Sequence, residues 1–205
     1  MTHYDDIYEI AADEYGIVTA AQAREAGVTT GEMSRWCSEG KLIRRGHGVY
    51  KLMRWVPTPY DAFAEAVALV GEGGYLWGES VLSLHGLALV DPQVITVATP
   101  KRVRRTLPSW VKIVPAPSTE RMTSYEGIPS QRVADAIEIC RASVMPERLI
   151  NAVEQARREG LLTAEEHGRL KEDLSWRNRN GRTADATSTS PSTGSAYALV
   201  RSPPA

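Results

Sequence analysis

The chain opens with an apolar pattern that is helical. Tyr4, Ile7 and Ala11 recur at the spacing of one helix face, and Gly16 is placed to end that helix. Mostly acidic side chains fill the positions between them. The pattern predicts an amphipathic first helix with one buried face.

Two helix-capping signals follow this first helix. Thr19 precedes Gln22 by three positions, and Thr29 precedes Glu32 in the same way. At this spacing the two side chains can satisfy each other's free backbone N–H groups at the start of a helix. The sequence therefore predicts two short helices, TAAQAREA and GEMSRWCSE, each followed by a glycine.

The next segment, KLIRRGHGVYKL (residues 41–52), places alternating residues on either side of a glycine-bearing turn. This pattern is typical of a β-hairpin. Three helices followed by a hairpin predict a winged helix-turn-helix domain over residues 1–56. In such a domain the third helix enters the major groove of DNA.

Residues 57–176 are predicted to form a second, helix-rich domain with a small β-sheet. Thr58 and Pro59 are placed to begin a helix in YDAFAEAVALV, and LWGESVLSLHGL predicts another helix that Gly86 closes. The segments predicted as strands are 94–99 and 110–114, with an edge strand and turn in MTSYEGIPS. The remaining helices are expected over 131–141, 146–160 and 163–176.

Residues 177–205 differ from the rest of the chain in composition. They are rich in Ser and Thr, contain prolines and have almost no apolar residues. Such a segment cannot bury enough apolar surface to fold, so a disordered tail is expected. The whole chain is accordingly predicted to be α+β and mostly helical.

The charge of the chain is balanced in total and uneven in distribution. The 24 Lys and Arg residues nearly cancel the 25 Asp and Glu residues, for a net charge of -1. Acidic residues dominate positions 1–31, whereas basic residues dominate positions 32–56. A single continuous segment is thus expected to form a basic face.

This basic segment is the main candidate site for binding DNA. Short polar side chains and an Arg on the third helix can read base edges in the major groove, and the candidates are Thr30, Ser34, Arg35 and Ser38. Cations on and beside the hairpin can contact phosphates, and these are Lys41, Arg44, Arg45, His47, Lys51 and Arg54. The alternative is a protein-docking module whose charges are only solvated.

A second basic cluster lies in PKRVRRTLP (residues 100–108), between the two predicted strands. Its cations are Lys101, Arg102, Arg104 and Arg105. They form either a solvated loop or a second contact with a polyanion or partner, such as flanking DNA, RNA or the surface of a toxin.

No catalytic set is predicted. The four histidines are scattered without metal-ligand spacing, and Ser80 lies in GESVL, which lacks the second glycine of a nucleophile elbow. Neither a Walker loop nor a dinucleotide-binding glycine motif occurs. We therefore expect no metal, no cofactor and no enzymatic activity. His85, before Gly86, is expected to be a helix C-cap residue, which is favourable to the helix dipole when it is charged.

Cysteine usage and hydropathy indicate the compartment. Cys37 and Cys140 are the only cysteines, which excludes a disulfide scaffold. No apolar run approaches the roughly 20 residues that span a bilayer, and the N-terminus lacks the pattern of a signal peptide. These features predict a cytoplasmic protein with no membrane partner.

Residues 5–175 resemble the AbiEi-type antitoxins of bacterial type IV toxin–antitoxin systems. In the first domain the resemblance lies in GIVT, the AGV turn, EGKLIRRG and GVYKL. In the second it lies in YLWGESVLSLHGL, VITVATPKRVRR and EGIPSQRVADAIEIC. In the last of these, Arg132 and Asp135 match the family pattern, whereas Val133 replaces its usual Thr.

The resemblance implies a function for each domain. The first is expected to bind inverted repeats in its own promoter and to repress the operon. The second is expected to neutralise a cognate nucleotidyltransferase toxin, either by direct contact or without a stable complex.

There are two alternatives to this antitoxin function. Relatives with a similar arrangement continue into a nuclease domain, but here the chain becomes rich in Ser and Thr where that domain would begin, and no carboxylate–Lys set follows. The other alternative is an ordinary winged-helix regulator whose C-terminal domain senses a ligand or a protein.

Overall fold

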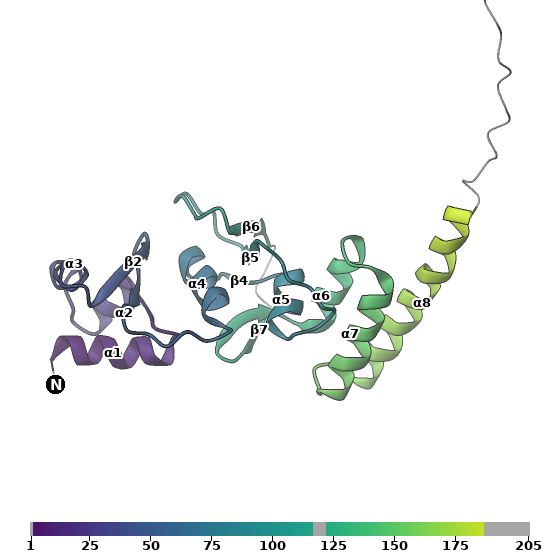
Figure 1. Cartoon of the computed structure of the whole chain (residues 1–205), viewed down its shortest axis with the longest axis horizontal. Helices are drawn as coiled ribbons and strands as arrows, with labels where there is room; N and C mark the ends of the chain where they lie inside the picture. The colour runs from purple at the N-terminus through teal and green to yellow at the C-terminus, as the bar shows by residue number, and fades with distance from the viewer. Residues whose placement is uncertain (1, 117–121, 187–205) are drawn as a thin grey trace, which may run out of the picture.

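The fold is α+β, with helices and two small sheets arranged in a row along the molecule (Figure 1). This computed structural model describes residues 2–116 and 122–186, with side chains as far as Trp176. Helix accounts for less than half of the chain, so "mostly helical" overstates the helical content. Of the expected tail, 177–186 continue the last helix and 187–205 lie outside the described residues.

The N-terminal unit, as we call residues 2–56, contains three helices and a three-stranded sheet. The helices are α1 (His3–Asp13), α2 (Ala20–Glu25) and α3 (Thr30–Ser38). The strands are β1 (Ile17–Thr19), β2 (Leu42–Gly46) and β3 (Val49–Leu52), in the antiparallel order β1-β3-β2. The three helices and the β2–β3 hairpin match the predicted elements, whereas β1 was not predicted.

Both predicted capping boxes of this unit are formed. The Thr19 hydroxyl accepts from the Gln22 amide, and the Gln22 side chain accepts from the Thr19 amide at 2.8 Å. Thr29 and Glu32 make the same reciprocal pair at the start of α3. These local bonds define where α2 and α3 begin, and thereby the turn between them.

The second unit, as we call residues 57–176, is built on a five-stranded mixed sheet. Its strands are β4 (Tyr75–Leu76), β5 (Ile95–Thr99), β6 (Val111–Pro115), β7 (Met122–Tyr125) and β8 (Ile128–Gln131). Their order is β6-β5-β4-β8-β7. Strands β5 and β6 are parallel neighbours, so the chain between them must cross over, and the basic segment 100–108 forms this crossover.

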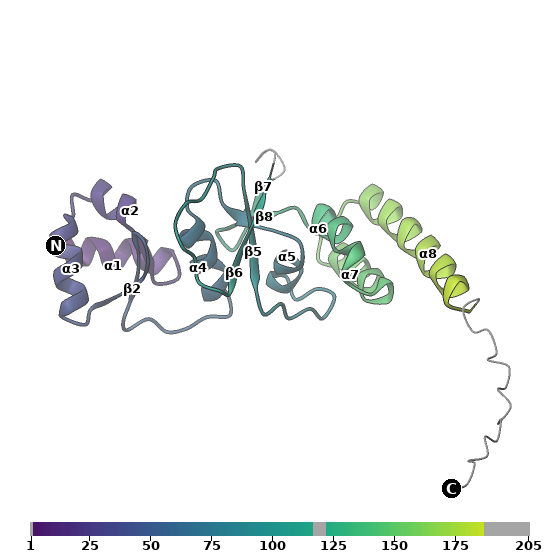
Figure 2. The same ribbon diagram turned by 90° about the horizontal axis from the view of Figure 1, so that it is seen from above.

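Six helical segments complete the second unit over the described residues. They are α4 (Asp61–Val70), α5 (Glu79–Leu84), α6 (Val133–Ile139), the 3₁₀ turn η1 (Cys140–Ala142) and α7 (Pro146–Arg158), followed by α8 (Ala164–Ala186). Helix α8 lies beside α7 at the end of the molecule remote from the N-terminal unit (Figure 2). It begins at the predicted Thr163–Glu166 capping box but ends later than the predicted boundary near Trp176.

Two predicted details are wrong. Helix α4 has Tyr60 as its N-cap, because the Thr58 hydroxyl bonds to the Asp61 carboxylate instead of capping the helix. The segment MTSYEGIPS is a complete hairpin of β7 and β8, not one edge strand with a turn. The turn at Glu126 and Gly127 takes left-handed backbone, which returns the chain alongside itself.

The N-terminal sheet packs on both of its faces. Val18 and Tyr50 are paired across β1 and β3 and join the core formed with α1, α2 and α3. Ile17 and Val49 lie on the other face, because side chains alternate along a strand, and they join the core of the second unit. Apolar contact therefore continues from one unit into the next.

Candidate nucleic-acid interface

Helix α3 is held by its buried face and presents a polar face to solvent. Met33 is 2% exposed and Trp36 is 3% exposed, and both belong to the N-terminal core. The predicted base-reading residues are all exposed on the other face: Thr30, Ser34, Arg35 and Ser38. Arg35 lies 3.6 Å from Glu39 across one helical turn, a weak exposed pair that another anion can replace.

The start of α3 is stabilised by a charged capping interaction. The Glu32 carboxylate accepts from the Thr29 backbone and hydroxyl, and it lies 2.9 Å from Nδ1 of His3 on α1. These hydrogen bonds favour the ionised form and lower the pKa of Glu32 from 4.5 to about 2. The same contacts join α1 to the beginning of α3.

Acid should therefore weaken the N-terminal unit through Glu32. A carboxylate with a lowered pKa stabilises the fold above its ordinary pKa, and this contribution is lost as the pH falls from about 4.5 towards 2. Glu32→Gln should lower the Tm at pH 7, with a difference from wild type that closes towards pH 2. Thermal melts followed by circular dichroism across this range test it. The control is Glu9→Gln on the exposed side of α1; an equal effect of both changes would contradict the assignment.

Five of the predicted phosphate-contacting residues are exposed around the hairpin, and one of them, Arg45, is also paired with α4. The other four are Lys41, Arg44, His47 and Arg54, and His47 lies in the turn between β2 and β3. Lys41 is oriented by the ring of Tyr4, whose centroid is 5.2 Å from its Nζ, and by Glu39 at 2.8 Å. Arg44 donates from Nε to the carbonyl of Gly46 at 3.3 Å. These cations remain open to solvent, which a phosphate contact requires.

Arg45 and Lys51 are directed towards α4 instead. Arg45 donates to Glu65 at 2.7 Å, and Lys51 donates to Asp61 at 2.7 Å and lies 4.0 Å from Glu65. Both acids are buried, with Asp61 8% and Glu65 4% exposed. Arg45 keeps part of its side chain exposed, whereas the Lys51 side chain is only 18% exposed. The structure thus separates Lys51 from the exposed cations.

Sequence reasoning missed the two acids that hold these cations. Asp61 and Glu65 lie one turn apart on α4, in a segment that is otherwise almost wholly apolar. Two carboxylates at this spacing on an apolar helix indicate that basic partners will cover them. The two carboxylates are apparent in the sequence DAFAEAV, but the sequence does not show which cations pair with them.

The second basic cluster is divided between anchored and free cations. Lys101 pairs with Glu72 at 2.9 Å, and the Arg105 guanidinium donates to the carbonyl of Val70 at the end of α4. Arg102 and Arg104 are exposed, and within the described ranges neither forms an ion pair. The crossover loop is therefore fixed at two points while two arginines remain available.

His85 is the C-cap residue of α5, as the sequence predicted. Its ring centroid lies 4.0 Å from that of Tyr125. Burial lowers the pKa of His85 to about 4, against a smaller opposing effect of Glu159. This pKa favours the neutral ring at pH 7, so a charge interaction with the helix dipole requires a more acidic solution.

Metal sites and membrane-spanning helices are two further features to consider in the described residues. In the part of the chain that the structure describes, no group of three or more His, Cys, Asp or Glu side chains is placed to hold a metal ion. Within the same residues, no helix is both long enough and apolar enough to cross a membrane.

An exposed polar helix face beside exposed cations makes the N-terminal unit a candidate DNA-binding module. A comparison with protein families makes this more specific. The family described as "Transcriptional regulator, AbiEi antitoxin" matches residues 5–52, which run from α1 to the end of β3. No curated protein matches the chain. The resemblance is thus confirmed for this span, and an antitoxin or transcriptional-regulator role is supported.

Proposed function

We propose that this chain is a DNA-binding repressor of its own operon and the antitoxin of a type IV toxin–antitoxin pair. The observation that carries the DNA-binding part is the exposed face of α3, with Arg35 at its centre and Lys41, Arg44 and Arg54 on neighbouring segments. We interpret α2, the turn and α3 as a helix-turn-helix, and β2–β3 as its wing. The family match over residues 5–52 supports this interpretation.

In this proposal α3 enters the major groove and the wing lies along the phosphates. Ser34, Ser38 and Thr30 read base edges with Arg35, and the hairpin cations contact the backbone. Inverted repeats in the promoter then position two copies of the chain. Arg102 and Arg104 of the crossover loop are proposed as a second contact with a polyanion or partner.

Two kinds of arginine variant test the DNA-binding part. Arg44→Ala should weaken binding to all sequences alike and reduce the slope of log affinity against log salt by about 1, because one phosphate contact is lost. Arg35→Ala should instead cost about 1–3 kcal/mol on the preferred site and relax discrimination at one base position. Gel shifts on the upstream DNA of the gene, with excess nonspecific competitor and a salt series, measure both. Identical behaviour of the two variants on all sequences would contradict the groove assignment.

The antitoxin part rests on the resemblance of residues 5–175 to the antitoxin family and is assigned to the second unit. Coexpression of the full chain with a nucleotidyltransferase-like gene beside it should restore growth that the toxin alone prevents. The double variant Arg35→Ala/Arg44→Ala should still restore growth, because its second unit is intact. The competing proposal is an ordinary regulator that senses a ligand or protein through the second unit, and it predicts no such rescue.

A further inference from the structure

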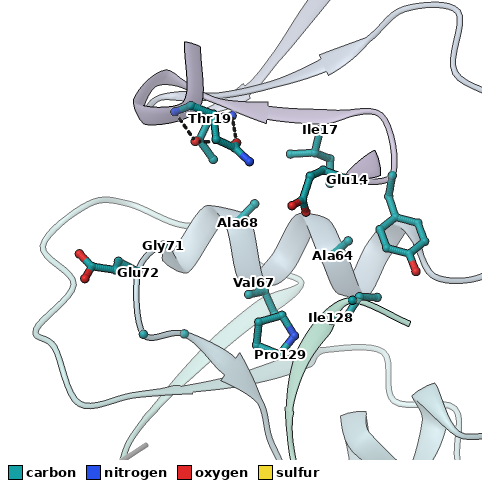
Figure 3. A pocket seen from close by; sticks show the side chains of 15 residues that line it. Glu14, Ile17, Thr19, Ala64, Val67, Ala68, Gly71, Glu72, Ile128 and Pro129 are labelled. Atoms are coloured by element: carbon teal, nitrogen blue, oxygen red, sulfur yellow. Dashed lines mark hydrogen bonds between the residues drawn. The ribbon is translucent and has the colours of Figure 1, made fainter. Parts of the chain in front are cut away.

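A hollow of about 340 Å³ lies between the two units. One wall comes from the end of α1 and from β1, and the facing wall comes from α4 and the glycine-rich turn after it (Figure 3). The start of β8 supplies the floor with Ile128 and Pro129. The volume is within the range of small-molecule sites, which are typically a few hundred Å³ and lie at junctions of this kind.

The hollow exists because the facing residues of α4 are small. Ala64 and Ala68 face Ile17 across it, and Val67 lies beside Pro129 (Figure 3). All three helix residues are only partly buried, although they pack against the main core on one side. The α4 wall is therefore aliphatic and can accept an apolar group, whereas Tyr15, Thr19 and Gln22 add polar groups to the facing side.

One charged group is directed into this cavity. The Glu14 carboxylate points towards α4 between Ile17 and Ala64, whereas Glu72 at the far end points away and pairs with Lys101 (Figure 3). Among the described residues Glu14 has no cationic partner. Partial desolvation, together with the charge of Asp13, raises the pKa of Glu14. Glu14 is nevertheless an exposed residue, so a ligand can reach its carboxylate from solvent.

The local backbone adds to the negative potential. Glu14 is the C-cap of α1, whose last turn contains no basic residue. Free carbonyl groups at the C-terminal end of a helix carry partial negative charge. A carboxylate, a helix C-terminus and aliphatic walls favour a ligand with a positive charge at one end and an apolar body.

We propose that this hollow binds a small organic amine, with the ammonium group at Glu14 and the apolar part against Ala64, Val67 and Ala68. An anion is disfavoured by the unpaired carboxylate. Because the walls belong to both units, a bound amine bridges them and fixes their contact.

Phenethylamine and its neutral counterpart 2-phenylethanol test the proposal on the full chain. Both have the same ring and a similar length, so they differ chiefly in charge. Phenethylamine should raise the Tm in a saturable way and bind at least about tenfold more tightly than the alcohol, as expected for a charge-assisted hydrogen bond. Isothermal titration measures the two affinities directly.

Three variants locate the binding site. Glu14→Gln should reduce phenethylamine affinity about tenfold and leave that of the alcohol unchanged. Asp13→Asn, which removes a neighbouring charge outside the hollow, should change the affinity for the amine much less. Ala68→Leu fills the cavity and should abolish binding of both probes, with its own Tm as the check of folding. Equal binding of the two probes, no binding at millimolar concentrations, or unchanged affinity in Glu14→Gln would overturn the proposal.

A regulatory consequence rests on the proposed DNA binding. If the bridged arrangement differs in its affinity for DNA, phenethylamine must shift DNA binding and DNA must shift amine binding by the same factor. The thermal and calorimetric measurements contain no DNA. They can therefore fail or succeed independently of the gel shifts.

Discussion

Replacing Lys51 by Met is expected to lower the free energy of unfolding by about 2–3 kcal/mol while leaving the salt dependence of DNA binding unchanged. Lys51 donates to Asp61 at 2.7 Å and lies 4.0 Å from Glu65. Without it, Glu65 keeps its pairing with Arg45, whereas the buried Asp61 keeps only the hydrogen bonds from Thr58. The sequence alone indicated that Lys51 contacts phosphate. In that case the replacement would weaken the salt dependence of DNA binding and leave the free energy of unfolding nearly unchanged.

The pH dependence of this variant gives a further check. Desolvation raises the pKa of Asp61, but hydrogen bonds from Lys51 and Thr58 outweigh it, so the net pKa is lowered. The stabilisation from Asp61 is therefore present above its ordinary pKa of 3.8 and is lost as the pH falls below that value. The loss of stability in Lys51→Met should accordingly shrink in acid, where Asp61 is protonated.

Lys41→Met is the matched control for the Lys51 change. Lys41 pairs with the exposed Glu39 on the outer surface, so its replacement should cost less than about 1 kcal/mol. It should instead reduce the salt slope of DNA binding. Denaturant unfolding measures the stability of both variants, and salt-dependent gel shifts measure their DNA binding. Equal losses of stability would contradict the distinction between Lys51, which contacts the second unit, and Lys41, which is proposed to contact DNA.

Trp36→Ala is expected to destabilise the N-terminal unit by about 3–5 kcal/mol and to abolish specific DNA binding. Trp36 is the largest side chain that holds α3 in the N-terminal core, and it is 3% exposed. Its ring meets Tyr4 edge to face, with centroids 5.3 Å apart. Removing it leaves a cavity beneath the helix that carries Arg35 and Ser34, so those residues lose their fixed positions.

Trp176→Ala provides the same change of residue type at an exposed position. Trp176 is 59% exposed on α8. Its removal should change the free energy of unfolding by no more than about 0.5 kcal/mol. Chemical denaturation followed by far-ultraviolet circular dichroism compares the two variants. A loss of similar size in both would show that Trp36 does not anchor α3 in the manner described.

The elements that were predicted correctly are those encoded by neighbouring residues. The Thr19–Gln22 and Thr29–Glu32 pairs define helix starts within four positions of chain, and the hairpin pattern of residues 41–52 is similarly local. The exposed face of α3 follows from the buried spacing of Met33 and Trp36. Fold class and the main candidate surface were therefore available from the sequence.

Strand β1 and the Thr58 cap show where local patterns fail. Three residues are too few to display an alternating pattern, and β1 forms only because β3 lies beside it. Thr58 matches the composition of an N-cap, but its hydroxyl bonds to the Asp61 side chain instead. For β1 a tertiary partner decides the conformation. For Thr58 the choice lies between local hydrogen bonds that the sequence allows equally.

By itself the sequence determined the helix starts, the hairpin, the concentration of cations in one segment and the resemblance of residues 5–52 that the family comparison confirmed. Only the tertiary structure decided which of those cations remain exposed, because long side chains choose their partners through space. In the folded chain Arg45 and Lys51 pair with the buried acids of α4, whereas Arg35 and Arg44 are exposed without a contact to α4. The hollow beside Glu14 likewise forms only where β1 and α4, which are distant in sequence, face each other.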